Sequence, residues 1–349
     1  MMRRILLVTL VLSLLRTGAF VASAWDYEGH RTVNQLALSC LPTNFPAFVH
    51  GVAATERIAF LGGEADRWRN VPDLALRHCN GPDHYLDVEQ LAVYGLNPEM
   101  LPVFRYDFVA QLALVRKEHP EKFPEPAAAR NEDHTRELVG LLPWAIAENY
   151  AKLKSGFAYL KAYQQDGGTP DEIANAEGNI LYVMGVLGHY VADASQPLHT
   201  TVHHHGWVGD NPQGYSTNSR IHGWIDGGYL AKVGGPGVER LNGKLREAKP
   251  VTLNGREAKP EEMFQAAVGF VMEQNRLVET LYQMEKEGKF SGEGDNGLAG
   301  KAFLETQLAR SGQWLADLWY SAFQQAPPDT FLKRQLAGRK GSTAREKTN

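Results

Sequence analysis

The sequence predicts an all-α fold, a single large and mostly helical domain whose helices are joined by long loops. Apolar residues recur three and four positions apart over most of the 349 residues, which is the period of one face of a helix. No convincing run of alternating apolar and polar residues indicates β-strands. Hydrophobic residues make up 43% of the chain, the proportion expected of a globular domain with its own core.

Five segments carry the helical period most clearly. The third has the best start signal, because Pro170 and Asp171 both favour the first turn of a helix. In the second, Pro143 lies inside the periodic pattern and predicts a kink. The expected helices are residues 28–41, 136–163, 170–194, 261–286 and 301–323.

The end of the chain differs in composition from the rest. After Pro327-Pro328 the chain is rich in Lys, Arg, Ser and Thr, and Phe331 is its only aromatic residue. Such a segment has too little apolar surface to form a packed core. We therefore expect residues 329–349 to form a basic, disordered tail, and residues 25–328 to form the domain.

Residues 1–24 have the pattern of a secretory signal peptide. Arg3-Arg4 precedes an apolar run at 5–15, and Ala22-Ser23-Ala24 supplies the small residues of a cleavage site. A membrane anchor is the alternative, although the apolar run is too short to span a bilayer as a helix. Cleavage would leave Trp25 as the first residue of a secreted or periplasmic protein with no stable membrane insertion.

The net charge argues against a protein that binds phosphates through a basic surface. Loss of Arg3, Arg4 and Arg16 with the signal peptide takes the formal charge from −4 to −7. If the protein handles nucleic acid or phospholipid, bound cations must supply positive charge locally.

Two cysteines, Cys40 and Cys79, remain after cleavage. In an oxidising compartment they are expected to form one disulfide, with two separate buried thiols as the alternative. Zinc ligation is not expected, since neither has a CxxC neighbour.

Histidine and aspartate gather in residues 189–226. His189 and Asp193 are four apart on the strongest predicted helix, so their side chains share one face. His199 follows the end of that helix, and His222 and Asp226 repeat the four-residue spacing. Neutral imidazoles and carboxylates are the ligands that zinc accepts outside thiolate sites, and five of them in under forty residues indicate more than one metal ion.

The N-terminal half adds further candidates in three short motifs. They are Trp25-Asp26-Tyr27-Glu28-Gly29-His30, Glu64-Ala65-Asp66-Arg67-Trp68-Arg69 and Asp83-His84-Tyr85-Leu86-Asp87. Each alone is equally compatible with a helix cap, a surface ion pair or a packed histidine.

Together with the block from Gly188 to His199, Gly-His-Tyr-Val-Ala-Asp-Ala-Ser-Gln-Pro-Leu-His, these motifs carry a resemblance. The set is similar to the zinc-dependent single-strand nucleases of the S-one/P-one type, relatives of bacterial zinc-dependent phospholipase C. The order and most local spacings match from residue 25 to 226. No aromatic clamp for an exposed base is evident, and Trp207, Tyr215 and Trp224 are its candidates, with core packing favoured for each.

The resemblance implies three Zn²⁺ ions per chain in a multi-zinc cleft. Asp66, His84, His189 and Asp193 would hold the first ion. The α-amino group and carbonyl oxygen of Trp25 would hold the second together with His30 and a bridging Asp193. His199, His222 and Asp226 would hold the third. Arg69 matches the arginine that contacts phosphate, and Asp87 the carboxylate that orients or deprotonates the attacking water.

This set of residues suits hydrolysis of a phosphodiester. A water that bridges two zinc ions has its pKa lowered toward neutrality and can attack phosphorus in line. We therefore expect an enzyme that hydrolyses single-stranded DNA or RNA to 5′-phosphate products, with 3′-nucleotidase activity as a possible addition. The substrate is nucleic acid or a nucleotide, and the sequence implies no protein partner.

Two alternatives stay open. A phospholipase C-like lipid hydrolase would use the same scaffold, but the short spacing from Trp25 to His30 and an Asp at position 226 favour the nuclease. A zinc-binding protein without catalysis would not need Arg69 or Asp87.

Two segments depart from the family pattern. The histidines at 203–205 (His203, His204 and His205) form either a solvated loop or a contact with substrate or extra metal. The segment 88–137 is long for a simple link and holds Phe104, Tyr106 and Phe108, which either cover the site or pack.

Overall fold

The computed structural model describes residues 25–346, with side chains as far as residue 339. The predicted signal peptide, residues 1–24, lies outside the described residues. The fold is all-α, with 67% of the chain in helices and 2% in strands, which confirms the predicted class. No helix in the described part of the chain is both long enough and apolar enough to cross a membrane.

The helices are joined by connections of very unequal length in both halves of the chain. The first half contains α1 (Tyr27–Ser39), α2 (Val52–Leu61), α3 (Glu64–Asn70), α4 (Leu74–Asn80), α5 (Val88–Val93), α6 (Arg105–Glu118), α7 (Leu142–Asp166) and α8 (Pro170–Ser195). The second half contains α9 (Ile221–Gly223), α10 (Tyr229–Lys232), α11 (Val238–Asn242), α12 (Met263–Asn275), α13 (Val278–Lys286), α14 (Gly294–Leu298), α15 (Gly300–Gln324) and α16 (Thr330–Glu346). A short antiparallel pair, β1 (Thr252–Leu253) and β2 (Arg256–Glu257), precedes α12.

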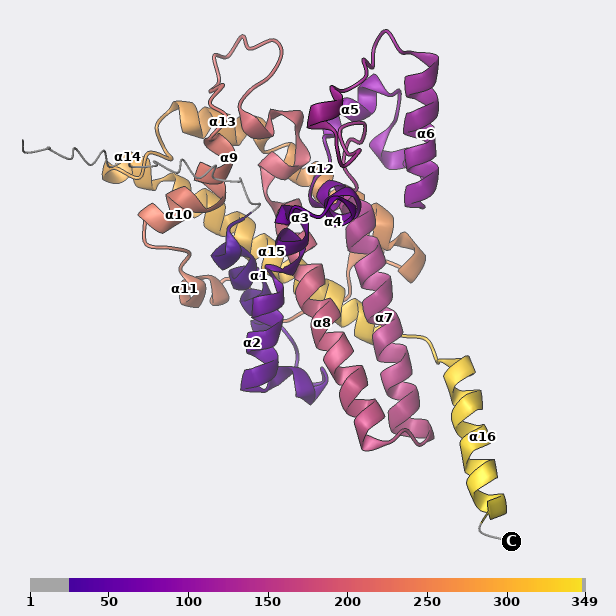
Figure 1. Cartoon of the computed structure of the whole chain (residues 1–349). Coiled ribbons are helices and arrows are strands. Elements are labelled where there is room, and N and C mark those ends of the chain that lie inside the picture. Colours follow the sequence, from indigo (N-terminus) through magenta and orange to yellow (C-terminus); the bar gives the residue numbers. More distant parts are fainter. Residues whose placement is uncertain (1–24, 347–349) are drawn as a thin grey trace, which may run out of the picture.

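Helix α8 lies at the centre of the molecule. It packs against α1, α2, α7, α12 and α15, and Figure 1 shows α7 and α8 side by side. Most buried apolar side chains of these helices belong to one contiguous core, in which Trp144, Tyr150 and Trp319 are among the largest fully buried residues. The C-terminal half of α8 is almost entirely buried, so polar side chains there are shielded from water.

Capping residues fix the start of α8. The Thr169 hydroxyl accepts from the Glu172 backbone N–H at 3.2 Å, and the Glu172 carboxylate accepts from the Thr169 N–H at 2.9 Å. Pro170 occupies the first turn, where its missing N–H costs nothing. At the other end Gln196 is extended and Pro197 follows, so the helix stops after Ser195 and confirms the predicted element.

Two glycines of α8 allow α1 and α2 to approach closely. A Cβ on Gly188 would lie 1.7 Å from Asn34 Oδ1, and a Cβ on Gly185 would lie 2.4 Å from the Leu61 Cβ. Asn34 is buried and donates from Nδ2 to the Ile58 carbonyl at 2.8 Å and the Gly185 carbonyl at 3.2 Å. These contacts hold α1, α2 and α8 together next to the histidines of α1 and α8.

Two helix predictions differ from the structure. Pro143 does not kink a helix, because α7 begins at Leu142 and the proline sits in its first turn. The chain before it is not helical and bonds elsewhere, with the Leu141 N–H donating to the Pro82 carbonyl at 2.7 Å. The expected helix 261–286 is divided into α12 and α13 near Arg276.

The expected disordered tail is wrong over most of its length, since residues 330–346 form α16. Leu332 and Leu336 pack against Ala162 of α7, and the Arg339 guanidinium pairs with Glu172 at 2.7 Å. Figure 1 shows α16 beyond the end of α15, alongside the outer part of α7. A four-residue spacing of leucines is enough to dock one face of an otherwise polar helix.

The expected disulfide is also wrong. Cys40 is buried at the end of α1, where its thiol donates to the Leu36 carbonyl at 3.2 Å. Cys79 is exposed on α4. The two thiols belong to different environments and both are free.

Candidate metal centre

Helix α8 supplies His189 and Asp193 from its last two turns. Both side chains are fully buried, and the four-residue spacing places His189 Nε2 3.3 Å from Asp193 Oδ2. His189 Nδ1 donates to the Gly62 carbonyl oxygen at 2.6 Å. That hydrogen bond sets the proton on Nδ1 and leaves the lone pair of Nε2 directed at the site.

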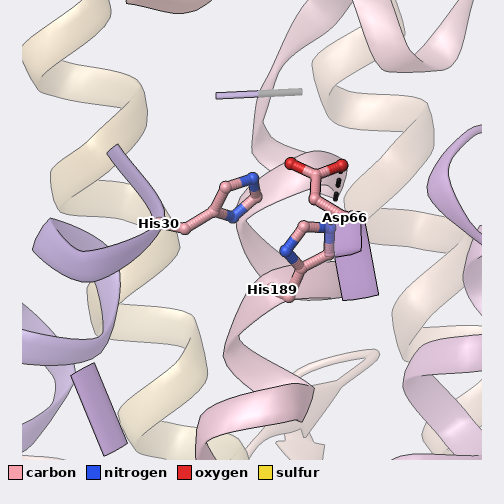
Figure 2. Close-up of side chains that lie close together, drawn as sticks. All are labelled: His30, Asp66 and His189. Atoms are coloured by element: carbon pink, nitrogen blue, oxygen red, sulfur yellow. Dashed lines mark ion pairs between the residues drawn. The ribbon is translucent and has the colours of Figure 1, made fainter. Parts of the chain in front are cut away.

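His30 and Asp66 reach the same point from the N-terminal half. His30 belongs to α1, and its ring stacks on His189 with centroids 3.9 Å apart (Figure 2). Asp66 belongs to α3, with Oδ1 4.0 Å from His189 Nε2. Each of the three residues offers a ligand atom within 4.8 Å of the others, which is compatible with a single cation between them.

His84 forms a second group with His189 and Asp193. It ends the 3₁₀ helix Gly81–His84, and its Nδ1 lies 2.9 Å from Asp193 Oδ2 and 3.0 Å from His189 Nε2. The other carboxylate oxygen, Asp193 Oδ1, lies 3.5 Å from His30 Nε2. Asp193 therefore has one oxygen near His84 and the other near His30, which is compatible with a carboxylate shared by two ions.

His199, His222 and Asp226 form a third group. His222 Nε2 lies 2.9 Å from His199 Nε2 and 3.0 Å from Asp226 Oδ2. Asp226 is in a π-helical turn, Trp224–Gly228, a form that is frequent at functional sites. Gln196 donates to Asp226 Oδ1 at 2.8 Å, so the residue after α8 orients this carboxylate.

The structure brings all eight predicted His and Asp ligands into these groups, but it divides some of them differently from the expectation. The third group has the expected members. His30 is grouped with Asp66 and His189, and its Nε2 also lies 3.5 Å from Asp193 Oδ1, the partner that the resemblance implies.

Burial keeps most of the imidazoles neutral. It lowers the pKa of His30 to about 3, with repulsion from His189 as the next cause. Burial is also the main cause that lowers the pKa of His84 to about 4, that of His222 to about 3, and that of His199 below its ordinary value. A neutral imidazole has the lone pair that a metal ion requires.

Two carboxylates of the centre are ionised at neutral pH. Burial would raise the pKa of Asp193, but His189 and His199 outweigh it and lower that pKa well below the ordinary value. Burial likewise opposes ionisation of Asp66, and His189 and Arg69 lower its pKa to about 2.

The donor set fits metal ions. His199 Nδ1 donates to the His84 carbonyl at 2.6 Å, so His199, like His189, turns the lone pair of Nε2 inward. Neither ring nitrogen of His30 has a hydrogen-bond partner among the described residues, although the ring is fully buried. Burial also raises the pKa of Asp226 well above its ordinary value, because the ionised carboxylate is destabilised there. A neighbouring divalent cation would stabilise the ionised form. Each buried polar group without a hydrogen-bond partner lowers the stability of the fold by about 1–3 kcal/mol unless a ligand bonds to it.

Trp25 lies against the same turn of α8. Its side chain is fully buried, and Nε1 donates to the Ala192 carbonyl at 3.0 Å and lies 3.3 Å from Ser195 Oγ. The next residue, Asp26, donates its N–H to the Asp226 carbonyl at 3.2 Å. The start of the domain is thus fixed beside Asp193 and the third group, and ligation by the Trp25 α-amino group stays a prediction.

A cavity of about 640 Å³ opens onto the third group. His199 and His222 line it together with Arg69 and Asp87. Arg69 Nη2 lies 3.4 Å from Asp66 Oδ1, which links this guanidinium to the first group. Asp87 Oδ1 is buried without a hydrogen-bond partner among the described residues, and burial and then Glu89 raise the pKa of Asp87 to about 7.

The histidines at 203–205 are divided between packing and the cavity. His203 stacks on Trp207 with ring centroids 3.9 Å apart, which is a packing role. His204 and His205 line the cavity, and His205 lies 5.2 Å from His222 between ring centroids. His204 Nδ1 is 3.8 Å from Asp87 Oδ1.

The aromatic candidates for a base clamp pack against the core, Tyr215 buried and Trp207 and Trp224 half-buried. Trp207 and Tyr215 contact each other and Tyr282, with ring centroids 4.7 to 5.7 Å apart. Trp224 donates from Nε1 to the Phe290 carbonyl at 2.8 Å. None of these aromatic side chains lines the cavity.

Of the three aromatic residues singled out in segment 88–137, one packs, and neither Phe104 nor Tyr106 lines the cavity. Phe108 is buried and stacks on Trp144, whereas Phe104 and Tyr106 are exposed. The end of the segment lines the cavity and contributes residues that the sequence motifs did not indicate. They are Arg130, Asp133, Thr135 and Arg136, and Arg77 of α4 lies with them.

Comparison with known protein families and with curated proteins finds no match to this chain.

Proposed function

We propose that the chain is a secreted, zinc-dependent phosphodiesterase that hydrolyses single-stranded DNA or RNA to 5′-phosphate products and removes 3′-phosphates from nucleotides. Three zinc ions per chain are assigned to the ligand groups described above. The observation that carries the proposal is that the third ligand group opens into a cavity also lined by Arg69 and Asp87. A cation site that serves only the fold has no need of such a cavity.

The residues of the cavity suit a phosphodiester. Arg69 presents a planar guanidinium that can donate two hydrogen bonds to the nonbridging oxygens of a phosphate. Its contact with Asp66 holds it at the edge of the ligand cluster, so a phosphate bound there lies next to the metal ligands. When bound, zinc ions lower the pKa of a coordinated water and offset charge on the phosphate and on the leaving oxygen.

Asp87 is placed to accept the proton of the attacking water. It begins helix α5 and is held by its backbone N–H, which donates to the Val139 carbonyl at 2.8 Å. A carboxyl group with a pKa of about 7 is divided between its acid and base forms at neutral pH, the condition under which general acid–base catalysis is most effective.

A comparison of two substrates tests the function. The zinc-loaded protein that begins at Trp25 is incubated with single-stranded DNA or RNA and with lecithin, each with and without a chelator. We expect acid-soluble nucleotides that carry 5′-phosphates, and we expect the chelator to abolish their release. Release of phosphocholine from lecithin without nucleotide release would instead establish a lipid hydrolase.

Metal analysis is an independent test of the three-ion assignment. A ratio of three zinc ions per chain supports it, and a ratio of one contradicts it. A zinc-loaded protein that cleaves neither substrate would be a zinc-binding protein without catalysis.

A further inference from the structure

The cavity has a wall that the proposed mechanism does not use. Arg77 comes from α4, whereas Arg130 and Arg136 come from the loop that precedes α7. These three arginines share the cavity with Arg69, so four guanidinium groups line a space of about 640 Å³ in a chain of negative net charge. A local concentration of positive charge against the overall balance indicates an anionic ligand.

The acidic residues of the wall offset only part of this charge. Arg77 Nη2 forms an ion pair with Asp133 Oδ2 at 2.9 Å. Arg130 and Arg136 take part in no ion pair with the described residues, and both are exposed. Two unneutralised arginines therefore face the same opening.

Buried hydrogen bonds fix the backbone that carries Arg136. Asn131 is buried, and its Oδ1 accepts from the Arg136 backbone N–H at 3.0 Å. Its Nδ2 donates to Glu137 Oε1 at 2.6 Å. Arg136 Nε also donates to the Arg130 carbonyl at 3.3 Å, which ties the two arginines to each other. Anchored in this way, the guanidinium loses less conformational entropy when it binds an anion.

The same loop is attached to α4. The Asp133 carbonyl oxygen lies 2.7 Å from His78 Nδ1, and Thr135 Oγ1 donates to Asp133 Oδ1 at 2.9 Å. Between these two residues, His134 has a φ of 53°, a conformation that costs free energy and persists only where neighbouring contacts impose it. The loop that carries Arg130 and Arg136 is therefore held in a fixed position at the cavity.

The wall lies near the third ligand group. His205 lines the cavity together with Arg136 and Arg69. The ring of His205 lies 5.2 Å from that of His222, which belongs to the third ligand group. The charges of Arg136 and Arg69 thus bear on the same end of the cavity.

We propose that Arg130 and Arg136 form a subsite for the phosphate adjacent to the scissile one in a nucleic acid strand. This inference rests on the proposed function and specifies its substrate class: strands with two or more phosphates are preferred over compounds with one. Arg69 takes the scissile phosphate, and the arginine pair takes its neighbour through charge-assisted hydrogen bonds. The fixed loop sets where that neighbour lies.

The test compares substrates that differ in phosphate number. Arg130→Gln/Arg136→Gln is assayed on a twelve-residue oligothymidylate and on thymidylyl-thymidine, which has a single phosphate. We expect kcat/KM for the oligonucleotide to fall by a factor of about 10–100, and that for the dinucleoside to change less than threefold. The slope of log kcat/KM against log salt should become shallower by about 0.7, because the pair neutralises one phosphate and each neutralised phosphate of a single strand contributes roughly 0.7.

A matched control removes two charges elsewhere. Arg57 and Arg276 are exposed and lie outside the cavity, so Arg57→Gln/Arg276→Gln should leave both activities and the salt slope close to those of the wild type. An equal loss on both substrates in the cavity variant, or the same loss in the control, would overturn the subsite.

Binding separates this inference from the proposed function. Fluorescence anisotropy of labelled oligothymidylate is measured in the presence of a chelator, with wild type and both variants. Weaker binding of the cavity variant alone, by roughly tenfold, supports the subsite even if the wild type hydrolyses nothing, a result that would contradict only the proposed function. Equal binding by all three proteins contradicts the subsite whatever the activity.

Discussion

At the scale of single residues, Asp87 combines burial with a position on the cavity. Its pKa is raised to about 7, so in the metal-free protein the carboxyl group is protonated at a pH where the unfolded chain has already lost that proton. A raised acid pKa makes the unfolded state bind fewer protons. The fold therefore loses stability as pH rises from about 3.8 to about 7.

Asp87→Asn should consequently reduce activity and increase stability. We expect kcat to fall by a factor of about 10²–10⁴, the usual contribution of a general base. In the metal-free protein the free energy of unfolding should rise by about 4 kcal/mol at pH 8, because the shift from 3.8 to about 7 is roughly three pKa units of about 1.4 kcal/mol each. Below pH 3.8 the difference should vanish. Urea unfolding of the variant and the wild type, with a chelator, measures the difference in the free energy of unfolding at pH 8 and at pH 3.5.

A loss of stability in Asp87→Asn at pH 8 would show that the carboxylate is satisfied in the fold and is not held in a raised-pKa state. Glu89→Gln is the control, because Glu89 is the second cause of the shift. This variant should lower the pH at which activity rises, without abolishing activity.

Trp25 supports a second prediction at this scale. Its indole is anchored by the hydrogen bond to Ala192, one residue from Asp193, so the free α-amino group of a processed chain is held near the ligand cluster. An α-amino group has a pKa near 8 and yields its proton to a metal readily, whereas a peptide nitrogen does not. One added alanine before Trp25 should therefore lower the zinc content by about one ion per chain and reduce activity at least tenfold.

Metal analysis and activity assays of the two N-termini check this prediction. Trp25→Phe, which keeps the amino group and loses the indole hydrogen bond, is the control and should retain more zinc than the extended form. Full activity and three zinc ions in the extended chain would remove the α-amino group from the ligand set.

The sequence motifs predicted the candidate ligands better than they predicted the residues that contact and orient those ligands. Residue type and spacing were enough for His189 and Asp193, since four residues on a helix fix a shared face whatever the tertiary structure. The Gly62 carbonyl that orients His189 has no sequence signal, because any residue has a carbonyl. Arg136 likewise depends on a loop path that local propensity does not encode.

At the scale of elements, the contact of α8 with α1 is the one that the site can least tolerate losing. Gly188 faces Asn34, and a Cβ there would lie 1.7 Å from Oδ1. Gly188→Ala should lower the free energy of unfolding by about 2–4 kcal/mol, because α1 must move and Asn34 must give up buried hydrogen bonds. Zinc affinity should fall as well, since His30 of α1 moves away from His189.

Gly178→Ala in the same helix is the matched control. A Cβ there meets nothing within 4 Å, so the change should raise stability by about 0.5–1 kcal/mol through helix propensity alone. If α1 and α8 approach as closely as described, thermal unfolding should give a lower Tm for Gly188→Ala and a higher Tm for Gly178→Ala. Equal effects would contradict it.

Element boundaries were predictable where local chemistry sets them and not where packing does. The Thr169–Glu172 capping box is local, and α8 begins where predicted. Pro143 was expected to kink a helix, but long-range hydrogen bonds from the N–H groups of Leu141 and Leu142 hold the preceding chain in a non-helical conformation. Helix α16 was missed because its polar composition hides Leu332 and Leu336, whose packing partner Ala162 is far away in sequence.

At the scale of the whole molecule, metal and fold should be coupled. The ligands come from α1, α3, α8, α9 and the turns between them, so ions bound to them connect parts of the chain that are distant in sequence. Binding only to the folded state adds about 2.7 kcal/mol at a ligand concentration a hundred times Kd. A chelator should thus lower Tm by roughly 5–10 °C.

Below the new Tm, the far-ultraviolet circular dichroism should keep its helical signal, because the apolar core does not depend on the ions. Addition of zinc should restore the original Tm, and His222→Ala should recover only part of it. An unchanged Tm after complete removal of zinc would show that the ligand groups contribute nothing to the fold.

The wide separation of the ligands along the chain also determines when the centre can form. Trp25 contacts a residue 167 positions away, and the third group is complete only with Asp226. Contacts of such separation form late in folding, after much of the core has assembled. Helix α15 packs against both α1 and α8, so that assembly awaits residues beyond 300. A chain still emerging from the ribosome therefore carries the candidate ligands of its N-terminal half before the metal centre can assemble. Under the proposed function, the nucleic acids of the cell that makes the protein would meet no active centre during synthesis.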